Sequence, residues 1–314
     1  MGKRFFPLYL ILAFLLAGFL FSCVPGKLAL DGQTGSRNLL APQADTARKL
    51  RNSFGTYNAP PRHANGRVDT ARLLAELKEI GANTYNFLVW QNRHDWEDLQ
   101  LFLPLARQKN ILVWVTIFPP SESVPFTKRY SEPFRLDFEK WAEEIARLSL
   151  TEPNLVAWSI DDFTVDLQFF TAEKTQGLTT IARNINRQLA FVPCCYYRQI
   201  ITPAFVSRYL PLIDGILFPY LHASGKENLT DTDRVTFEVD TIREVTGDRV
   251  PIILDVYASP HTGMPPTTPA YVKTVMEEGW RSADGVHVYR HQDRQKEPEK
   301  YEVIKQLFQT WKGS

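Results

Sequence analysis

The stretch "ILVWVTIF" at residues 111–118 is the clearest strand in this chain. Almost every position in it is apolar, and Pro119-Pro120 follows directly and ends the run. A short run that is apolar at successive positions is buried on both faces, which is typical of a parallel strand covered by helices. The stretch therefore predicts an α/β fold with a parallel sheet.

The same alternation of apolar strand and amphipathic helix continues on both sides of this stretch. Helices are predicted over residues 69–82, with Asp69 as the N-cap, and over residues 131–150, with Ser131 as the N-cap and Pro133 close behind. Eight such units fit into residues 50–314, and no GxGxxG turn of a dinucleotide-binding sheet is present. The pattern predicts one (β/α)8 TIM barrel, the catalytic domain, over residues 50–314.

The N-terminal region has the pattern of a secretory signal. Lys3 and Arg4 precede an apolar run over residues 8–21, which is shorter than the roughly 20 residues that a membrane-spanning helix needs. Leu20-Phe21-Ser22-Cys23 resembles a bacterial lipobox, and this resemblance implies a lipoprotein signal peptide over residues 1–22 and lipidation of Cys23. Residues 23–49 are rich in small residues and are predicted to form a flexible tether. We therefore expect a lipid-anchored protein of the bacterial cell envelope, with an ordinary signal peptide or an uncleaved anchor as the alternatives.

The composition argues against several classes of function. A formal net charge of +1 with interspersed charges gives no reason to expect a nucleic-acid or polyanionic partner. The three cysteines include Cys23 and the pair Cys194-Cys195, which we expect to be reduced in a buried strand, and no CxxC spacing indicates zinc. The chain has no GxSxG motif of serine hydrolases and no lysine in the predicted strands for a Schiff base. We expect no metal and no cofactor.

Acidic side chains follow the fourth and occupy the seventh predicted strand. The stretch "AWSIDDF" at residues 157–163 ends a buried strand with Asp161 and Asp162, and Asp255 lies within the apolar "IILDVY". Side chains alternate along a strand, so Asp161 shares the face of the small residues Ser159 and Ala157 and is expected to point into the barrel mouth. Two carboxylates this close raise the pKa of one of them, which suits a general acid.

Aromatic and hydrogen-bonding residues end the other predicted strands, where a barrel carries its active site. Rings can stack on the apolar faces of sugars while polar groups bind their hydroxyls. The candidate carbohydrate-binding residues are Tyr57, Asn86, Trp90, Tyr197, Tyr220, His222, Tyr257, Tyr289 and Arg290.

The Asp-Asp pair at the fourth strand resembles that of the N-acetylhexosaminidases that use substrate assistance. The resemblance implies that Asp161 orients the acetamido group, that Asp162 is the acid/base, and that Tyr220 or Tyr257 holds the acetamide. More broadly, the chain resembles glycoside-hydrolase-like barrels found as bacterial lipoproteins. A second arrangement pairs an acid on strand 4 with Asp255 on strand 7, as in retaining glycosidases whose carboxyl groups lie about 5–5.5 Å apart.

These observations predict a glycoside hydrolase that acts on a polysaccharide or glycoconjugate outside the cytoplasm. Asp161, Asp162 and Asp255 are the predicted catalytic residues. The alternative is a non-catalytic carbohydrate-binding lipoprotein on a degenerate glycosidase barrel.

Overall fold

The structure is a computed structural model that describes residues 44–261 and 263–313. The predicted signal peptide, Cys23 and most of the predicted tether lie outside these residues. The described residues belong to a single compact unit. No helix in the described part of the chain is long and apolar enough to cross a membrane.

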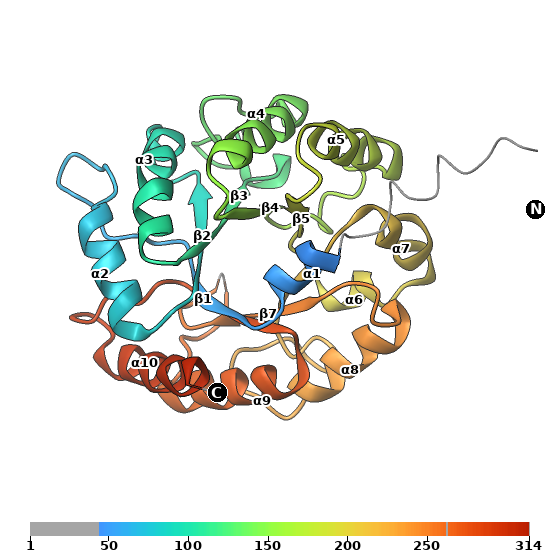
Figure 1. Cartoon of the computed structure of the whole chain (residues 1–314). Coiled ribbons are helices and arrows are strands. Elements are labelled where there is room, and N and C mark those ends of the chain that lie inside the picture. The colour runs from blue at the N-terminus through green and yellow to red at the C-terminus, as the bar shows by residue number, and fades with distance from the viewer. Residues whose placement is uncertain (1–43, 262, 314) are drawn as a thin grey trace, which may run out of the picture. The chain divides into compact units, whose positions relative to one another are not determined.

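Eight parallel strands form the sheet, in the order β5-β4-β3-β2-β1-β8-β7-β6. Their bounds are β1 (Ser53–Tyr57), β2 (Thr84–Val89), β3 (Leu112–Ile117), β4 (Leu155–Ile160), β5 (Ala190–Phe191), β6 (Ile216–Pro219), β7 (Ile252–Tyr257) and β8 (Gly285–Tyr289). The sheet curls on itself and helices surround it (Figure 1). The predicted (β/α)8 barrel is confirmed.

The barrel closes between β5 and β6 through an irregular segment. Cys194 pairs with Leu217 in a parallel bridge, in which the Cys195 amide donates to the Leu217 carbonyl at 2.9 Å and the Leu217 amide donates to the Pro193 carbonyl at 3.1 Å. Pro193 has no N–H to donate, so the regular strand is limited to Ala190–Phe191. The pair Cys194-Cys195, expected within a buried strand, lies in this irregular segment instead.

Helices follow the strands and cover the outside of the barrel. They are α1 (Ala44–Leu50), α2 (Thr70–Ile80), α3 (Asp95–Gln108), α4 (Phe138–Thr151), α5 (Ala172–Ile185), α6 (Tyr197–Ile200), α7 (Pro203–Arg208), α8 (Val235–Thr246), α9 (Pro269–Ser282) and α10 (Pro298–Lys312), with 3-10 turns η2 (Pro120–Glu122) and η3 (Leu210–Leu212). The predicted cap of α2 is present, because the Asp69 side chain accepts a hydrogen bond from the Arg72 amide at 3.0 Å.

The predicted start of the helix at Ser131 is wrong. Helix α4 begins at Phe138, where Asp137 accepts a hydrogen bond from the Lys140 amide at 2.9 Å. The Ser131 hydroxyl instead accepts from the Phe118 amide at 2.9 Å and ties the β3–α4 loop to the end of β3. Residues 131–137 are therefore part of a long loop at the carboxyl ends of the strands.

Two apolar cores lie on the two sides of the sheet. The inner core fills the barrel and includes Tyr57, Trp114 and Cys194, whereas the outer core lies between strands and helices and includes Trp141 and Trp158. Leu50 at the end of α1 is fully buried in the inner core, and Figure 1 shows α1 across the opening where the strands begin. The inner core therefore leaves the carboxyl ends of the strands as the open end.

Candidate active site

Asp161 and Asp162 both turn toward the mouth of the barrel. The Asp161 amide donates to the Ile117 carbonyl at 3.0 Å, which continues the pairing of β4 with β3 and points the side chain inward, as the alternation predicts. Asp162 would then point toward the helices, but its backbone is left-handed, with φ of 44°. This conformation is uncommon for residues other than glycine and is tolerated best by Asp and Asn. It turns the Asp162 side chain back over the mouth.

Two tyrosines face this carboxylate pair. The Tyr196 hydroxyl, which reaches over from the end of the irregular fifth strand, donates a hydrogen bond to the Asp162 carboxylate. Tyr57 lies beside Asp161, and their contact lowers the pKa of the Asp161 carboxyl. That contact lacks standard hydrogen-bond geometry, so the buried Tyr57 hydroxyl has no such partner among the described residues.

Burial and mutual repulsion raise the pKa values of the acids in the mouth. Desolvation and the Asp162 charge raise the pKa of Asp161 to about 7. Burial also raises the pKa of Asp162, while the hydrogen bond from Tyr196 opposes the rise. Because the two groups are coupled, they titrate as a pair. The hydrogen bond from Tyr196 favours the ionised form of Asp162, so Asp161 is the member of the pair that keeps a proton near neutral pH.

Glu122, at the end of η2, is a third acid of the mouth. Burial and the charges of Asp161, Asp162 and Asp166 raise its pKa to about 9, so it is protonated at neutral pH. Its carboxyl makes no hydrogen bond or ion pair with any residue of the described ranges, whereas Asp166 accepts from the Ser121 hydroxyl at 2.6 Å. Glu122 is therefore a half-buried proton donor without a partner in the protein.

Asp255 lies deeper in the barrel. It is 2% exposed, and its Oδ1 has no hydrogen-bond partner in the described part of the chain. Desolvation raises its pKa well above the ordinary value, and the Asp161 charge adds to this effect. Its strand neighbour His287 is fully buried against Trp114, with ring centroids 4.5 Å apart, and burial lowers the pKa of His287 to about 3. Asp255 is thus a protonated acid beneath the mouth rather than an exposed one.

The structure brings some of the predicted carbohydrate-binding residues to the mouth. Tyr289 packs edge-on against Tyr57 and Tyr257, with ring centroids 5.2 and 5.3 Å apart. Tyr257 also contacts the ring of His261 at 4.8 Å. Trp90 stacks on Phe118 at the edge of the mouth, with ring centroids 4.2 Å apart. Tyr57, Tyr257 and Tyr289 form a continuous aromatic wall around the mouth.

Other predicted residues lie elsewhere. Asn86 is fully buried inside the barrel and accepts a hydrogen bond from the Thr116 hydroxyl at 2.7 Å. Tyr197 packs in the helix layer, and Tyr220 donates to the Asp231 carbonyl at 3.1 Å beneath the β6–α8 loop. His222 lies in that loop, with Nε2 3.0 Å from Asp233 Oδ1. Arg290 is exposed and lines a neighbouring cavity.

Tyr196 and Glu122 were not among the residues selected from the sequence. Period-two counting along Val192, Cys194 and Tyr196 could have identified Tyr196, because all three point into the barrel. Glu122 follows no such pattern, since it belongs to a 3-10 turn whose direction depends on the loop.

One group of side chains in the described residues could hold a cation. Asp161, Asp162 and Cys194 each bring one ligand atom within 4.8 Å of the others. Both cysteines are free, and burial raises the pKa of the Cys194 thiol well above its usual value. A metal would therefore have to displace the thiol proton, which disfavours binding at neutral pH.

No protein-family model matches the chain, and no curated protein matches it in sequence. Solved structures do resemble it. A β-glucuronidase from an uncultured Clostridium sp. is 14% identical with a TM-score of 0.55, covering 83% of this chain and 50% of that one. A glucosidase from Croceicoccus marinus is 11% identical with a TM-score of 0.58, covering 83% of this chain and 68% of that one.

A GH2 β-galacturonidase from Eisenbergiella tayi, bound to galacturonate, is 13% identical with a TM-score of 0.52 and covers 83% of this chain and 51% of that one. The chain therefore spans about half the length of the two uronidases. At these identities the likeness concerns the fold. The chain shares its barrel fold with these glycosidases.

Proposed function

We propose that this protein is a glycoside hydrolase whose reaction takes place at Asp161 and Asp162. The observation that carries the proposal is the pair itself: two half-buried carboxyl groups at the end of β4, one favouring its proton and the other hydrogen-bonded by Tyr196 in its ionised form. Glycoside hydrolysis needs both states at once, because one group protonates the leaving oxygen while another stabilises positive charge on the sugar. The glycosidase-like barrel supports the same reading.

We infer a role for each group from its surroundings. Asp161, with a pKa of about 7, gives its proton to the glycosidic oxygen as the C–O bond breaks. The Asp162 carboxylate stabilises the positive charge that develops at the anomeric carbon. Water then attacks that carbon and returns a proton to Asp161. These roles are exchanged relative to those implied by the resemblance to N-acetylhexosaminidases, because the Tyr196 hydroxyl is bonded to Asp162.

Substrate assistance fits this arrangement better than a strand 4/strand 7 pair. Adjacent residues of one strand approach a sugar from the same side, whereas retaining and inverting pairs flank the scissile bond. Asp255 is 2% exposed and cannot reach a substrate without moving. A 2-acetamido group would then supply the nucleophile. The comparison that tests this step is the turnover of nitrophenyl 2-acetamido glycosides against that of the matching 2-hydroxyl glycosides.

The experiment for the overall proposal is hydrolysis of a panel of nitrophenyl glycosides and envelope glycans. Asp161→Asn, Asp162→Asn and Asp255→Asn are assayed beside the wild type, with circular dichroism as the control for folding. We expect Asp161→Asn and Asp162→Asn to lose at least a hundredfold in kcat, the scale typical of general acid–base catalysis. Wild-type turnover that both variants retain would overturn the assignment.

The second candidate is a sugar-binding protein without catalysis. The complete burial of Asp255 favours it, because one acid pair then remains at the mouth while the aromatic wall is kept. Binding of glycans with no turnover in the wild type would select this function.

We also propose that the protein is anchored in the bacterial cell envelope through a lipid on Cys23. The basic start, the apolar run of residues 8–21 and the lipobox-like end support this location. Mass spectrometry of the N-terminal peptide from native membranes tests it, with Cys23→Ser as the control that should appear in the soluble fraction.

A further inference from the structure

Two cavities lie among the loops at the carboxyl ends of the strands. The first, of about 480 Å³, lies at the ends of β7, β8 and β1, and the second, of about 360 Å³, lies between the β2–α3 and β3–α4 loops. Gln91 lines both, so the cavities adjoin at the end of β2. We call the two together the rim groove. Volumes of this size suit a bound ligand.

The rim groove has an excess of uncompensated positive charge. Eight Lys or Arg residues and four Asp or Glu residues line it. Each of the four acids already has an ion pair: Glu76 with Arg72, Asp293 with Arg72, Glu132 with Arg135, and Glu297 with Lys300. The exposed cations without an ion pair in the described ranges are Arg93, Lys128, Arg129, Arg290 and Lys296. Their charges are free for a ligand.

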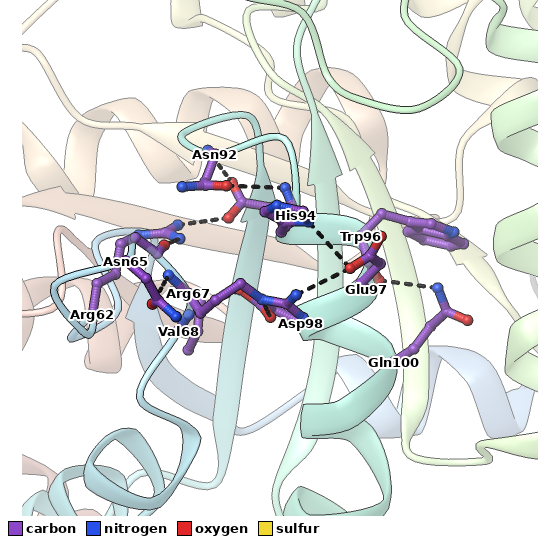
Figure 2. Close-up of polar contacts among 12 residues, drawn as sticks. Arg62, Asn65, Arg67, Val68, Asn92, His94, Trp96, Glu97, Asp98 and Gln100 are labelled. Atoms are coloured by element: carbon purple, nitrogen blue, oxygen red, sulfur yellow. Dashed lines mark hydrogen bonds and ion pairs between the residues drawn. The ribbon is translucent and has the colours of Figure 1, made fainter.

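The wall of the groove is held in place by an ion pair between a half-buried arginine and a buried aspartate. Arg62 lies 2.8 Å from Asp95, whose carboxylate also accepts hydrogen bonds from the Trp90 and Asn92 amides at 3.1 and 2.9 Å. Figure 2 shows the surrounding network, in which Arg67 joins the β1–α2 loop to Asp98 on α3. The groove is therefore organised before a ligand binds, which lowers the entropic cost of binding.

The second cavity combines charge with an aromatic face. The Arg129 guanidinium lies over the Trp90 ring, 5.2 Å from its centroid, and Lys128 and Tyr130 line the same cavity. A sugar ring can pack against such a surface while its acidic group bonds the guanidinium. The first cavity offers Arg290, which follows Tyr289 of the aromatic wall directly in sequence.

We propose that the rim groove binds a glycan that carries anionic groups, with Arg290 and Lys296 at one end and Lys128 and Arg129 at the other. The inference names the substrate class and so rests on the proposed hydrolysis at Asp161 and Asp162. Guanidinium and ammonium groups bind carboxylate and sulfate through charge-assisted hydrogen bonds. These cationic groups would hold the glycan across the mouth, so that one of its sugars lies beside Asp161 and Asp162.

The test is a calorimetric titration of the full-length chain in a non-ionic detergent. The probes are tetragalacturonate, its methyl ester, which has the same sugars without the charge, and a sulfated galactan tetrasaccharide. We expect tetragalacturonate or the sulfated sugar to bind at least tenfold more tightly than the neutral ester, with affinity that falls as salt rises. The better of the two charged probes identifies the anionic group.

The variants Arg290→Gln and Lys128→Gln each remove one free cation, and each is expected to weaken binding by about tenfold, the scale of one charge-assisted hydrogen bond. Lys109→Gln is the matched control, since Lys109 is an exposed cation at the C-terminal end of α3, on the opposite end of the barrel. Equal binding of the neutral ester, or equal losses in the control, would overturn the inference. A single-stranded oligonucleotide that binds as tightly as the sugars would also overturn it.

The outcomes separate this inference from the proposed hydrolysis. Selective binding of the charged sugars without turnover of any glycan would support the anionic-glycan site and contradict the proposed hydrolysis. Turnover of neutral glycosides without selectivity for charged sugars would support the proposed hydrolysis and contradict the anionic-glycan site.

Discussion

Replacing Tyr196 by Phe removes one hydroxyl and one hydrogen bond, the bond that the hydroxyl donates to the Asp162 carboxylate. The ring stays in the inner core of the barrel, so the packing at the end of the fifth strand is kept. The perturbation therefore acts on the ionisation of Asp162 rather than on the fold.

The size of the effect follows from the bond that is lost. A hydrogen bond to a charged group contributes about 1.5–3 kcal/mol, and one pKa unit corresponds to about 1.4 kcal/mol. Because Asp162 is half-buried, solvent replaces part of the bond, and we take the lower end, about one pKa unit. The bond lowers the pKa of Asp162, so its loss raises that pKa. The limb of the pH–rate profile that requires ionised Asp162 therefore moves up by about one pH unit.

The assay is kcat/KM against pH for the substrate identified by the glycan panel. Tyr197→Phe is the matched control, because Tyr197 is the adjacent tyrosine, lies in the helix layer and has no hydrogen bond from its hydroxyl among the described contacts. The control should leave the limb unchanged. A Tyr196→Phe enzyme that loses activity equally at every pH, or whose limb moves down, would refute the reasoning about Asp162.

Three further predictions concern stability and inhibition. The pKa values of Glu122 and Asp161 are raised to about 9 and about 7, so between the unfolded and the folded pKa values the folded state keeps protons that the unfolded chain has released. The free energy of unfolding is therefore greatest below the unfolded pKa values and falls as pH rises, by up to about 1.4 kcal/mol per pH unit for each group. Chemical denaturation at a series of pH values should show this fall, and Glu122→Gln should flatten its upper part; a pH dependence unchanged in that variant would contradict the protonation of Glu122. Asp95→Asn should cost up to about 3 kcal/mol in the free energy of unfolding, because it removes the ion-pair partner of the half-buried Arg62. Glu97→Gln removes exposed ion pairs with Arg67 and His94 and should cost less than about 1 kcal/mol. Equal losses in the two variants would contradict the role of Asp95 in holding the groove wall. Zn²⁺ should inhibit hydrolysis more strongly above neutral pH, as the Cys194 thiol loses its proton more readily, and Cys194→Ser should weaken the inhibition; equal inhibition of both proteins would show that the ion binds elsewhere.

The barrel could be predicted from the sequence because its strands are apolar on both faces. Residues 111–118 and the other apolar strands are stable only when both of their faces are buried, and the helices between the strands cover the outer face. The incorrect prediction of a helix start was local, and it arose because two side chains could both serve as the N-cap. Ser131 was a good N-cap by type, but its hydroxyl is used by the Phe118 amide, and Asp137 caps the helix instead.

The site was harder to predict because it depends on backbone turns after the strands. Alternation placed Asp161 correctly toward the mouth, since that residue still pairs with β3. No such rule reaches Asp162, whose direction is set by a left-handed φ of 44°. Alternation along Val192 and Cys194 favours Tyr196 over Tyr197, but it does not give the direction of the Tyr196 hydroxyl toward Asp162. Residue types were therefore easier to predict than the directions of their side chains.

The polar groups beneath the mouth suggest why these acids are kept. Asp255 Oδ1, both ring nitrogens of His287 and the Ser159 hydroxyl are buried without a hydrogen-bond partner among the described residues. Each such group costs about 1–3 kcal/mol relative to a satisfied one, and apolar residues of similar size would pack there more favourably. Burial raises the pKa of Asp255, and the Asp161 charge adds to this effect, so Asp255 stays neutral beside the acids of the mouth. A protonated Asp255 is thus compatible with a single ionised carboxylate at the mouth. We interpret the stability lost through these unsatisfied polar groups as the cost of a functional site that keeps some of its acids protonated.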